Sequence, residues 1–443
     1  MTSTSGTSPS SDASPRRATF LLTSSTLPGH LLRVLDLAQQ LSVRGHRVLF
    51  KTKATASAEV AAAGAELMPY EHCVDLADRM AVFQLSQPPW WMPKIPFGIA
   101  MGRATVHTHG VQLARELEPI LRRERVDCVV YDFFEFGAAW AAERVGVPAA
   151  SAGNMGTALT PDELPLLFEE LPAMKPLTRA PALAHGLLDQ LMPLAPARAK
   201  LGLSPYEGRT ADLVRAMISR ELHIVMAHRG FAGGVPLRDH QAFVGPTSFN
   251  RASPIDEDAP QVAPGTVVVS TTTTGKDGGL FRRVLEAVAP LHVPILATAA
   301  SADDIPSGLG DHVRITQYIP HDTAFPSARA LITHGGWGTV GRALTHGLPM
   351  LVIPLFGDQI LNATLVEHAK LGRHLPLAKA SPEAIRAALQ ELLSDEEILA
   401  RARHAADEIK RLKDDQVAAR ALERLVFERE AGRQTERPSR AAA

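Results

Sequence analysis

A glycine-rich turn in the second half of the chain joins an apolar run to a helical pattern. The run 330–333 is followed by His334-Gly335-Gly336-Trp337-Gly338-Thr339, and helical spacing then continues to His346. Glycines let the backbone approach a ligand closely, and the free N–H groups at a helix start attract phosphate. The same residues could form a tight turn whose glycines serve packing alone, because short glycine motifs are weak signals. The turn is therefore a candidate phosphate site.

A carboxylate and an amide follow the next apolar run. Asp358 and Gln359 come shortly after the run 350–354, and Asn362 stands one helical turn later. Open parallel sheets bind ligands at the carboxyl ends of their strands. This pair suits hydrogen bonds to adjacent sugar hydroxyls. Asp358 could also cap the helix that begins here, and the two interpretations are compatible.

Short apolar runs alternate with helical patterns along most of the chain, which predicts an α/β fold with parallel, doubly wound sheets. Strands are expected at 19–23, 46–51, 66–69, 127–131, 147–151, 266–270, 294–298, 313–317, 330–333 and 350–354, and helices at 31–41, 54–63, 105–125, 135–145, 279–291, 382–393 and 395–430. A Pro-rich, acidic connector divides the strands into two series. Two Rossmann-like halves should face each other across a cleft. The predicted divisions are a disordered tail at 1–17, a first domain at 18–245, a linker at 246–265, a second domain at 266–415, a C-terminal helix at 416–431 that could return to the first domain, and a disordered tail at 432–443.

Two stretches interrupt this alternation in the first half. The segment Gln87–Arg103 is rich in Pro and contains Trp90, Trp91 and Phe97, which predicts a long aromatic loop. Long loops inside compact domains are often functional. The aromatic side chains could bind an apolar ligand, or they could pack into the core of their own domain. The segment 153–196 is also irregular.

Composition is that of an ordinary globular protein, with 45% hydrophobic residues, 21% charged residues and a formal net charge of −1. It shows no nucleic-acid footprint and no electrostatic membrane anchor. Two distant cysteines and the lack of a long apolar run favour a cytoplasmic protein without disulfides or a membrane span. The run Asp256-Glu257-Asp258 is flanked by prolines and is interpreted as a solvated linker, so no metal site is expected.

The turn 334–339, together with 347–349, 354–359 and Asn362-Ala363, resembles the donor-site signature of the UDP-glycosyltransferase superfamily. These are inverting enzymes of GT-B architecture and include bacterial macrolide and polyketide glycosyltransferases. Gly29-His30 with the run 44–46 resembles the opening of the family, and the likeness extends over residues 18–425.

The resemblance implies transfer of a hexose, glucose in the first instance, from a UDP or dTDP sugar to a hydroxyl of a small apolar acceptor. The nucleotide sugar would be a co-substrate, with no further cofactor and no metal. A nucleotide-sugar epimerase or phosphorylase of the same fold, or a catalytically silent sugar-nucleotide-binding protein, are the alternatives, since fold alone does not fix function.

In the family a histidine after the first strand is the catalytic base, and His30 matches it. A base of pKa near 7 suits removal of a hydroxyl proton during attack. Asp132, at the end of a later strand, matches the acidic partner that would fix the imidazole tautomer and stabilise the imidazolium. Alternatively, His30 is a solvated residue at a helix start and Asp132 caps the helix that follows it.

The remaining site residues implied by the resemblance form two sets. The donor set is Thr272, Thr273, Tyr318, His334, Gly336, Trp337, Gly338, Thr339, Asp358 and Gln359, and the acceptor set is Trp90, Trp91 and Phe97.

Three positions depart from the family pattern. Arg33 stands where a proline usually follows the base by three residues. Tyr318-Ile319-Pro320-His321 replaces a Trp-x-Pro-Gln motif, although Tyr318 could still stack on a pyrimidine. Arg342 replaces the acidic residue that commonly holds both ribose hydroxyls. If Arg342 faces the ribose, weak discrimination between UDP and dTDP donors is expected.

Overall fold

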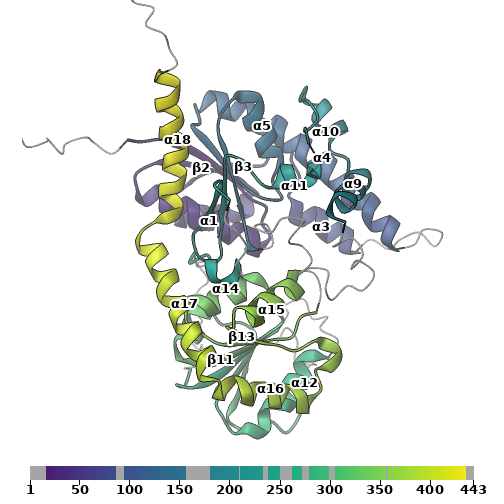
Figure 1. The fold of residues 1–443 in the computed structure, drawn as a ribbon, viewed down its shortest axis with the longest axis vertical. Coiled ribbons are helices and arrows are strands. Elements are labelled where there is room, and N and C mark those ends of the chain that lie inside the picture. The colour runs from purple at the N-terminus through teal and green to yellow at the C-terminus, as the bar shows by residue number, and fades with distance from the viewer. Residues whose placement is uncertain are drawn as a thin grey trace, which may run out of the picture.

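The computed structural model describes residues 16–85, 94–155, 180–208, 210–232, 238–249, 262–271, 279–298, 305–355 and 358–435. It contains a seven-stranded sheet in the order β3-β2-β1-β4-β5-β6-β7 and a six-stranded sheet in the order β10-β9-β8-β11-β12-β13. Paired strands run parallel in both sheets, for example β1 with β4 and β8 with β11. Figure 1 shows the two sheets one above the other, with helices around each. The predicted α/β fold with two Rossmann-like halves is confirmed.

The strands of the first sheet are β1 (Thr19–Thr23), β2 (Arg47–Thr52), β3 (Glu66–Pro69), β4 (Cys128–Asp132), β5 (Ala149–Gly153), β6 (Leu222–Val225) and β7 (Gln241–Phe243). Those of the second are β8 (Thr266–Ser270), β9 (Ile295–Thr298), β10 (Val313–Thr316), β11 (Ala328–Thr333), β12 (Met350–Val352) and β13 (Gly372–His374). The helices of the first half are α1 (Pro28–Val43), α2 (Ser57–Ala62), α3 (Leu76–Leu85), α4 (Lys94–Arg123), α5 (Gly137–Val145), α9 (Pro181–Leu191), α10 (Ala195–Ala199) and α11 (Asp212–Met217). Those that follow are α12 (Leu280–Val288), α13 (His321–Ala324), α14 (Trp337–Thr345), α15 (Asp358–His368), α16 (Pro382–Ser394), α17 (Glu396–Asp414) and α18 (Val417–Thr435).

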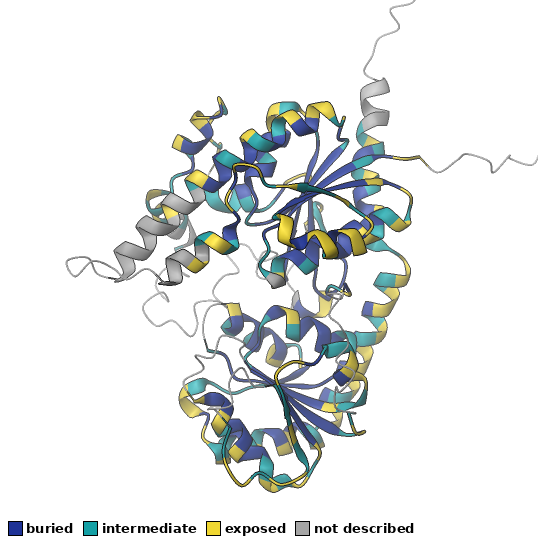
Figure 2. Ribbon diagram, turned by 180° about the vertical axis from the view of Figure 1, so that it is seen from behind, coloured by how far each residue is buried: buried dark blue, intermediate teal, exposed yellow. Residues whose placement is uncertain are grey.

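The strands are continuous apolar runs because both faces of each sheet are covered by helices. In β1, Phe20, Leu21 and Leu22 are all fully buried. Phe20 and Leu22 belong to a cluster that includes residues of α1 and α18, whereas Leu21 belongs to one that includes residues of α4 and α5. Figure 2 shows the resulting layers, with buried strands between helices whose outer faces are exposed.

The C-terminal helices connect the two halves. The sequence predicted one helix over 395–430, but the structure has two, α17 and α18, because the chain turns at Gln416, whose φ is +51°. After this turn α18 runs along the first half (Figure 1). Arg44 Nε and Nη2 donate to the Glu423 carboxylate at 2.6 and 2.8 Å, and His46 Nε2 lies 2.8 Å from the same group. Helix α18 is thus hydrogen-bonded to the segment between α1 and β2 of the first half.

Several predicted elements differ from the observed ones. Helix α4 begins at Lys94, so the predicted loop 87–103 is helical over its second half. A proline such as Pro96 is tolerated there because the first turn of a helix needs no backbone N–H. Trp90 and Trp91 lie outside the described residues, as does the side chain of Phe97. Helix α9 interrupts the segment 153–196, and the short strands β6, β7 and β13 carry no clear sequence signal.

Residues 246–249 of the connector are hydrogen-bonded to helices of both halves, α1 and α14. Thr247 Oγ1 donates to the Leu32 carbonyl at 3.2 Å, and Ser248 Oγ donates to Asp36 Oδ1 at 3.0 Å. Lys413 of α17 pairs with the other oxygen of Asp36 at 2.7 Å. The connector is therefore fixed between α1 and the second half. Residues 250–261, including Asp256–Asp258, lie outside the described part.

Within the described residues, no helix is both long enough and apolar enough to cross a bilayer. Cys73 and Cys128 are both buried and have free thiols. Burial raises the pKa of the Cys128 thiol far above its ordinary value, so this sulfur stays protonated.

Replacing Leu422 tests whether α18 is integral to the first half. Leu422 is fully buried among residues of α1, β1 and β2. The substitution Leu422→Ala should lower the free energy of unfolding by about 2–5 kcal/mol, as is usual for such truncations in a core. Chemical denaturation measures this loss. Val43→Ala is the control, because Val43 is 73% exposed and its truncation should cost less than about 0.5 kcal/mol. Equal losses in both variants would mean that α18 does not stabilise the fold.

Candidate functional site

His30 and Asp132 meet at the carboxyl edge of the first sheet. Strands β1 and β4 are parallel neighbours, so the loop after β1 and the end of β4 open on the same edge. His30 lies in the first turn of α1, and Asp132 is the last residue of β4. His30 Nδ1 is 2.8 Å from Asp132 Oδ1. The His30 side chain is 18% exposed, whereas Asp132 is fully buried.

Two further donors complete the environment of the Asp132 carboxylate. Arg33, one turn after His30 on α1, donates from Nη1 to Oδ2 at 3.0 Å. The backbone N–H of Phe134 donates to Oδ1 at 3.1 Å. Burial alone would raise the pKa of Asp132, but His30, Arg33 and this N–H together hold it below its ordinary value. Asp132 is therefore an anion at neutral pH, as a partner of a catalytic imidazole must be.

Aromatic rings hold the His30 imidazole in place. Its centroid lies 5.2 Å from the Phe134 ring at an interplanar angle of 29°, and 5.3 Å from the Phe133 ring. With Nδ1 directed at Asp132, Nε2 is the ring atom that can accept a proton. The arrangement can act as a general base with a fixed tautomer.

A second His–carboxylate pair anchors the loop that follows Asp132. Glu135 is fully buried, its backbone N–H donates to the Asp132 carbonyl at 2.7 Å, and its carboxylate lies 2.8 Å from His109 Nε2 of α4. His109 Nδ1 faces the Val74 carbonyl at 3.1 Å and Cys73 Sγ at 3.5 Å. Burial alone would lower the pKa of His109, but Glu135 raises it well above its ordinary value. A buried ion pair thus secures the segment that carries Asp132 and its two aromatic neighbours.

The glycine-rich turn lies at the carboxyl edge of the second sheet, between β11 and α14. Gly335 has φ +88°, and a Cβ there would lie 2.7 Å from Val352 Cγ1, so glycine is required by backbone conformation and by packing. A Cβ on Gly336 would lie 2.8 Å from His334 Nε2. Gly338 differs, because no atom of the described residues outside its own helix lies within 4 Å of the place where its Cβ would be. The first two glycines shape the turn, and the third leaves room beside the start of α14.

Side chains of α15 support this turn. Asn362 Nδ2 donates to the Gly335 carbonyl at 2.9 Å. Gln359 is 7% exposed, and its Oε1 accepts from the Leu355 N–H at 2.9 Å. Asp358 begins α15 and is exposed. Asp358 is therefore the more accessible member of the predicted sugar-binding pair. The side-chain oxygen of Gln359 is already hydrogen-bonded to the backbone of Leu355, in the loop before α15.

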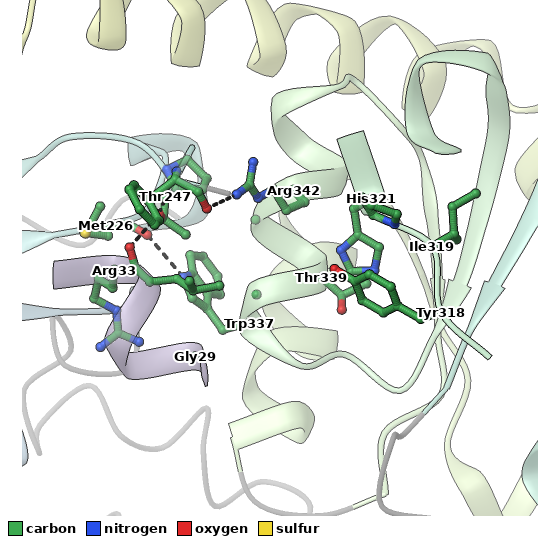
Figure 3. A pocket seen from close by; sticks show the side chains of 16 residues that line it. Gly29, Arg33, Met226, Thr247, Tyr318, Ile319, His321, Trp337, Thr339 and Arg342 are labelled. Carbon is green, nitrogen blue, oxygen red and sulfur yellow. Dashed lines mark hydrogen bonds between the residues drawn. The ribbon is translucent and has the colours of Figure 1, made fainter. Parts of the chain in front are cut away.

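A cavity of about 430 Å³ separates the two edges. Its first-half wall comes from α1 and its second-half wall from α14 and the loop before α13, with connector residues between them (Figure 3). Of the predicted site residues, it brings together Tyr318, Trp337, Gly338 and Thr339. His30, Asp132, His334, Gly336, Asp358 and Gln359 are not among its lining residues, although Gly29 and Arg33 beside the dyad are.

The aromatic residues of the cavity have different roles. Tyr318 is 57% exposed, so its ring is available to a ligand. Trp337 is 8% exposed, and its Nε1 donates to the Met226 carbonyl of the first half at 3.2 Å. His321 stacks on Phe325, and burial followed by the charge of Arg342 lowers its pKa to about 4. Trp337 therefore joins the two halves, while Tyr318 is a free platform.

His334 is half-buried behind the turn. Burial lowers its pKa, against the opposing effects of the Ser270 backbone and of Asp358. The imidazole is therefore neutral at ordinary pH. Thr272 and Thr273, the predicted donor residues that follow β8, lie outside the described residues.

Arg342 lines the cavity, but its guanidinium is engaged by protein groups. Nη1 donates to Asp322 Oδ2 at 2.7 Å and to the Ser248 carbonyl at 3.2 Å, and Nη2 donates to the Phe249 carbonyl. His346 Nε2 binds the other Asp322 oxygen at 2.9 Å. From the sequence, a role for Arg342 in facing the ribose was one hypothesis. In the structure its guanidinium instead connects α14 to the connector by hydrogen bonds.

Arg33 and the His109–Glu135 pair are the features that sequence reasoning did not assign to the site. A signal was present for Arg33, since it stands one helical turn after His30 and so shares its face. The contact of Glu135 with His109 joins residues 26 positions apart and has no sequence signature. In the described part of the chain, no group of three or more His, Cys, Asp or Glu side chains is placed to hold a metal ion.

Comparisons with known proteins agree with the two-domain fold. The family model described as UDP-glucoronosyl and UDP-glucosyl transferase matches residues 283–428. The NDP-glycosyltransferase YjiC of Bacillus subtilis (strain 168) is 22% identical over 410 residues, covering 89% of this chain and 94% of that protein. The 4'-demethylrebeccamycin synthase of Lentzea aerocolonigenes is 26% identical over 399 residues, covering 86% and 93%.

A solved structure gives the same result for the whole fold. The calicheamicin glycosyltransferase CalG4 superimposes with a TM-score of 0.67 at 25% identity, covering 96% of this chain and all of that one. Two parallel-sheet domains, a glycine-rich turn at the edge of the second and a His–Asp pair at the edge of the first are thus found in a chain that resembles such enzymes along most of its length. The chain is a glycosyltransferase of GT-B architecture, and its residues 283–428 match the UDP-glycosyltransferase family model.

Proposed function

We propose that this enzyme is an inverting, metal-independent glycosyltransferase that moves a hexose, glucose in the first instance, from a UDP or dTDP sugar to a hydroxyl of a small apolar acceptor such as a polyketide or macrolide. The observation that carries the proposal is the His30–Asp132 contact of 2.8 Å, beside a cavity that Gly29 and Arg33 line on one wall and residues 337–339 of the glycine-rich turn line on the other. The base would act on the attacking acceptor hydroxyl, and the phosphate-binding turn would act on the leaving diphosphate.

The displacement is a single step. The acceptor hydroxyl gives its proton to His30 Nε2 while its oxygen forms a bond to the anomeric carbon of the sugar. The bond from that carbon to the diphosphate oxygen breaks on the opposite face, and its electron pair leaves with the nucleoside diphosphate. Asp132 stabilises the imidazolium that results. One displacement inverts the configuration at the anomeric carbon.

The start of α14 is where we place the diphosphate. Free backbone N–H groups and the helix dipole favour an anion there, and the open space beside Gly338 allows close approach. Thr339 adds a hydroxyl, and Tyr318 offers a ring on which the nucleobase of the donor can stack. We propose that Asp358, which is exposed at the start of α15, accepts hydrogen bonds from sugar hydroxyls. Thr272 and Thr273 remain predicted donor contacts.

An apolar acceptor is supported by the sequence and by the relatives. Trp90, Trp91 and Phe97 supply an aromatic segment in the acceptor half. The similar proteins include a 4'-demethylrebeccamycin synthase and a calicheamicin glycosyltransferase. We therefore extend the acceptor class of natural products to this enzyme.

Product analysis tests the proposal. The enzyme is incubated with UDP-glucose or dTDP-glucose and a panel of hydroxylated polyketides and flavonoids, with and without a chelator, and products are identified by mass spectrometry and NMR. We expect a β-glucoside from an α-linked donor in both conditions. An epimerised nucleotide sugar, or binding without any product, would instead support the epimerase or the silent binding protein. Loss of transfer on chelation would contradict metal independence.

Removing the base should abolish transfer. His30→Ala should lower kcat by about 100- to 10,000-fold, the usual contribution of a general base, and leave the Kd of UDP and dTDP nearly unchanged. Asp132→Asn should also lose most of the rate, because the imidazole tautomer is no longer fixed. Asp78→Asn is the control, because Asp78 is 49% exposed in a surface pair with Lys53. Turnover of His30→Ala close to that of the wild type would refute the mechanism.

Replacing Arg342 distinguishes a junction residue from a ribose reader. Arg342→Glu loses three hydrogen bonds and places a second carboxylate beside Asp322. We expect a loss of about 3 kcal/mol in stability, as for other broken buried pairs, with little change in the ratio of kcat/KM for UDP-glucose and dTDP-glucose. Calorimetry and steady-state kinetics measure the two quantities. Preference shifting towards the UDP sugar at unchanged melting temperature would show that Arg342 reads the ribose.

The tryptophans of the acceptor half give a fourth test. Trp90→Ala and Trp91→Ala should each raise the KM of the acceptor about tenfold, equivalent to about 1.4 kcal/mol of lost contact, and leave the KM of the donor unchanged. A fall in melting temperature with an unchanged acceptor KM would mean that these rings belong to the domain core.

A further inference from the structure

Arg33 is a buried cation beside the His–Asp pair. Its side chain is 4% exposed, and it stands where the family usually has a proline. A buried charge is costly unless it is paired, and an arginine is rarely kept at such a position for packing alone. We therefore examine which charges pair with Arg33 and what its own charge does in the site.

The contacts of Arg33 lead to the base. Among the described residues, its one hydrogen-bond partner is Asp132, at 3.0 Å from Nη1 to Oδ2. Its guanidinium carbon lies 5.4 Å from the centroid of the Phe133 ring, which also contacts His30. Arg33 lines the cavity between the halves, and Figure 3 shows it on the α1 side, across the cavity from Thr339. It thus contacts the dyad and the space for the donor.

The charges around this group can be summed. Besides Asp132, Asp358 of α15 also attracts the charge of Arg33, and that charge in turn acts on His223 of β6. Burial first, then His240 and other groups including Arg33, lower the pKa of His223 to about 3, so His223 is neutral. Burial lowers the pKa of Arg33 against the attraction of Asp132 and Asp358, but an arginine remains charged. Arg33 and Asp132 cancel each other, so the three-residue group has no net charge when His30 is neutral.

We propose that Arg33 is the third member of the dyad, a positioning residue that fixes the Asp132 carboxylate and makes the group net positive when His30 takes the acceptor proton. A two-residue dyad would be neutral at that moment. The positive charge appears as the diphosphate leaves from the opposite wall, and it stabilises that anion in a site whose described residues offer no metal ligand group. The inference rests on the proposed role of His30 as the base.

The pH dependence of kcat/KM tests the charge. At low pH His30 is protonated and cannot act, so kcat/KM falls along an acid limb. Arg33→Gln keeps a hydrogen-bond donor but removes the charge, so His30 should protonate more readily. We expect the acid limb to move to higher pH by about one unit, with a lower kcat at the optimum. Arg33→Lys keeps the charge and should return the limb close to that of the wild type.

Controls separate this effect from simple damage. Arg47→Gln removes an arginine that is 42% exposed and paired with Glu66, and it should leave the limb unchanged. If Arg33→Gln does not fold, Arg33→Leu removes the charge and keeps an apolar contact with Phe133. An acid limb that stays in place in the uncharged variants, with only kcat reduced, would overturn the inference. In that case an inactive His30→Ala would leave the proposed function standing, whereas an active His30→Ala would overturn both.

Discussion

The burial of the Asp132 carboxylate determines how the first-sheet side of the site is built. A carboxylate with no exposed surface is stable only if donors inside the protein replace its water, and here an imidazole, a guanidinium and a backbone N–H do so. Two of these donors lie one turn apart on α1, so the carboxylate fixes how this helix begins. The same requirement keeps Asp132 ionised, as its proposed role beside His30 needs.

The second constraint is the parallel arrangement of both sheets. Parallel strands direct their carboxyl ends to one edge, and each half therefore gathers its chemistry on a single rim. The position of one rim relative to the other depends on the junction. Trp337 contacts the Met226 carbonyl, Arg342 binds the connector, and α18 returns to pack on α1. A change at the junction would alter the cavity even where no ligand contact is lost.

Local signals predicted most of the fold and the positions that give the site its chemistry. The alternation of apolar runs and helical patterns gave the α/β class, and the glycine-rich run was placed correctly between a strand and a helix. The C-terminal segment was predicted as one helix because its helical pattern is continuous through the turn at Gln416. The segment 87–103 was predicted as a loop because its prolines were read as breakers, yet a proline at a helix start costs little.

The sequence by itself determined which residue types follow each strand, because a strand and the turn and helix after it are specified by residues that are neighbours in the chain. Only the tertiary structure decided which of them meet. The contact between Arg33 and Asp132 joins residues 99 positions apart, and Arg342 contacts a connector carbonyl 93 positions away. Such pairs depend on strand order and on the packing of the two halves, which no local pattern encodes. For this reason the sequence could name an arginine at each position, whereas only the fold showed that one contacts Asp132 and the other contacts the connector.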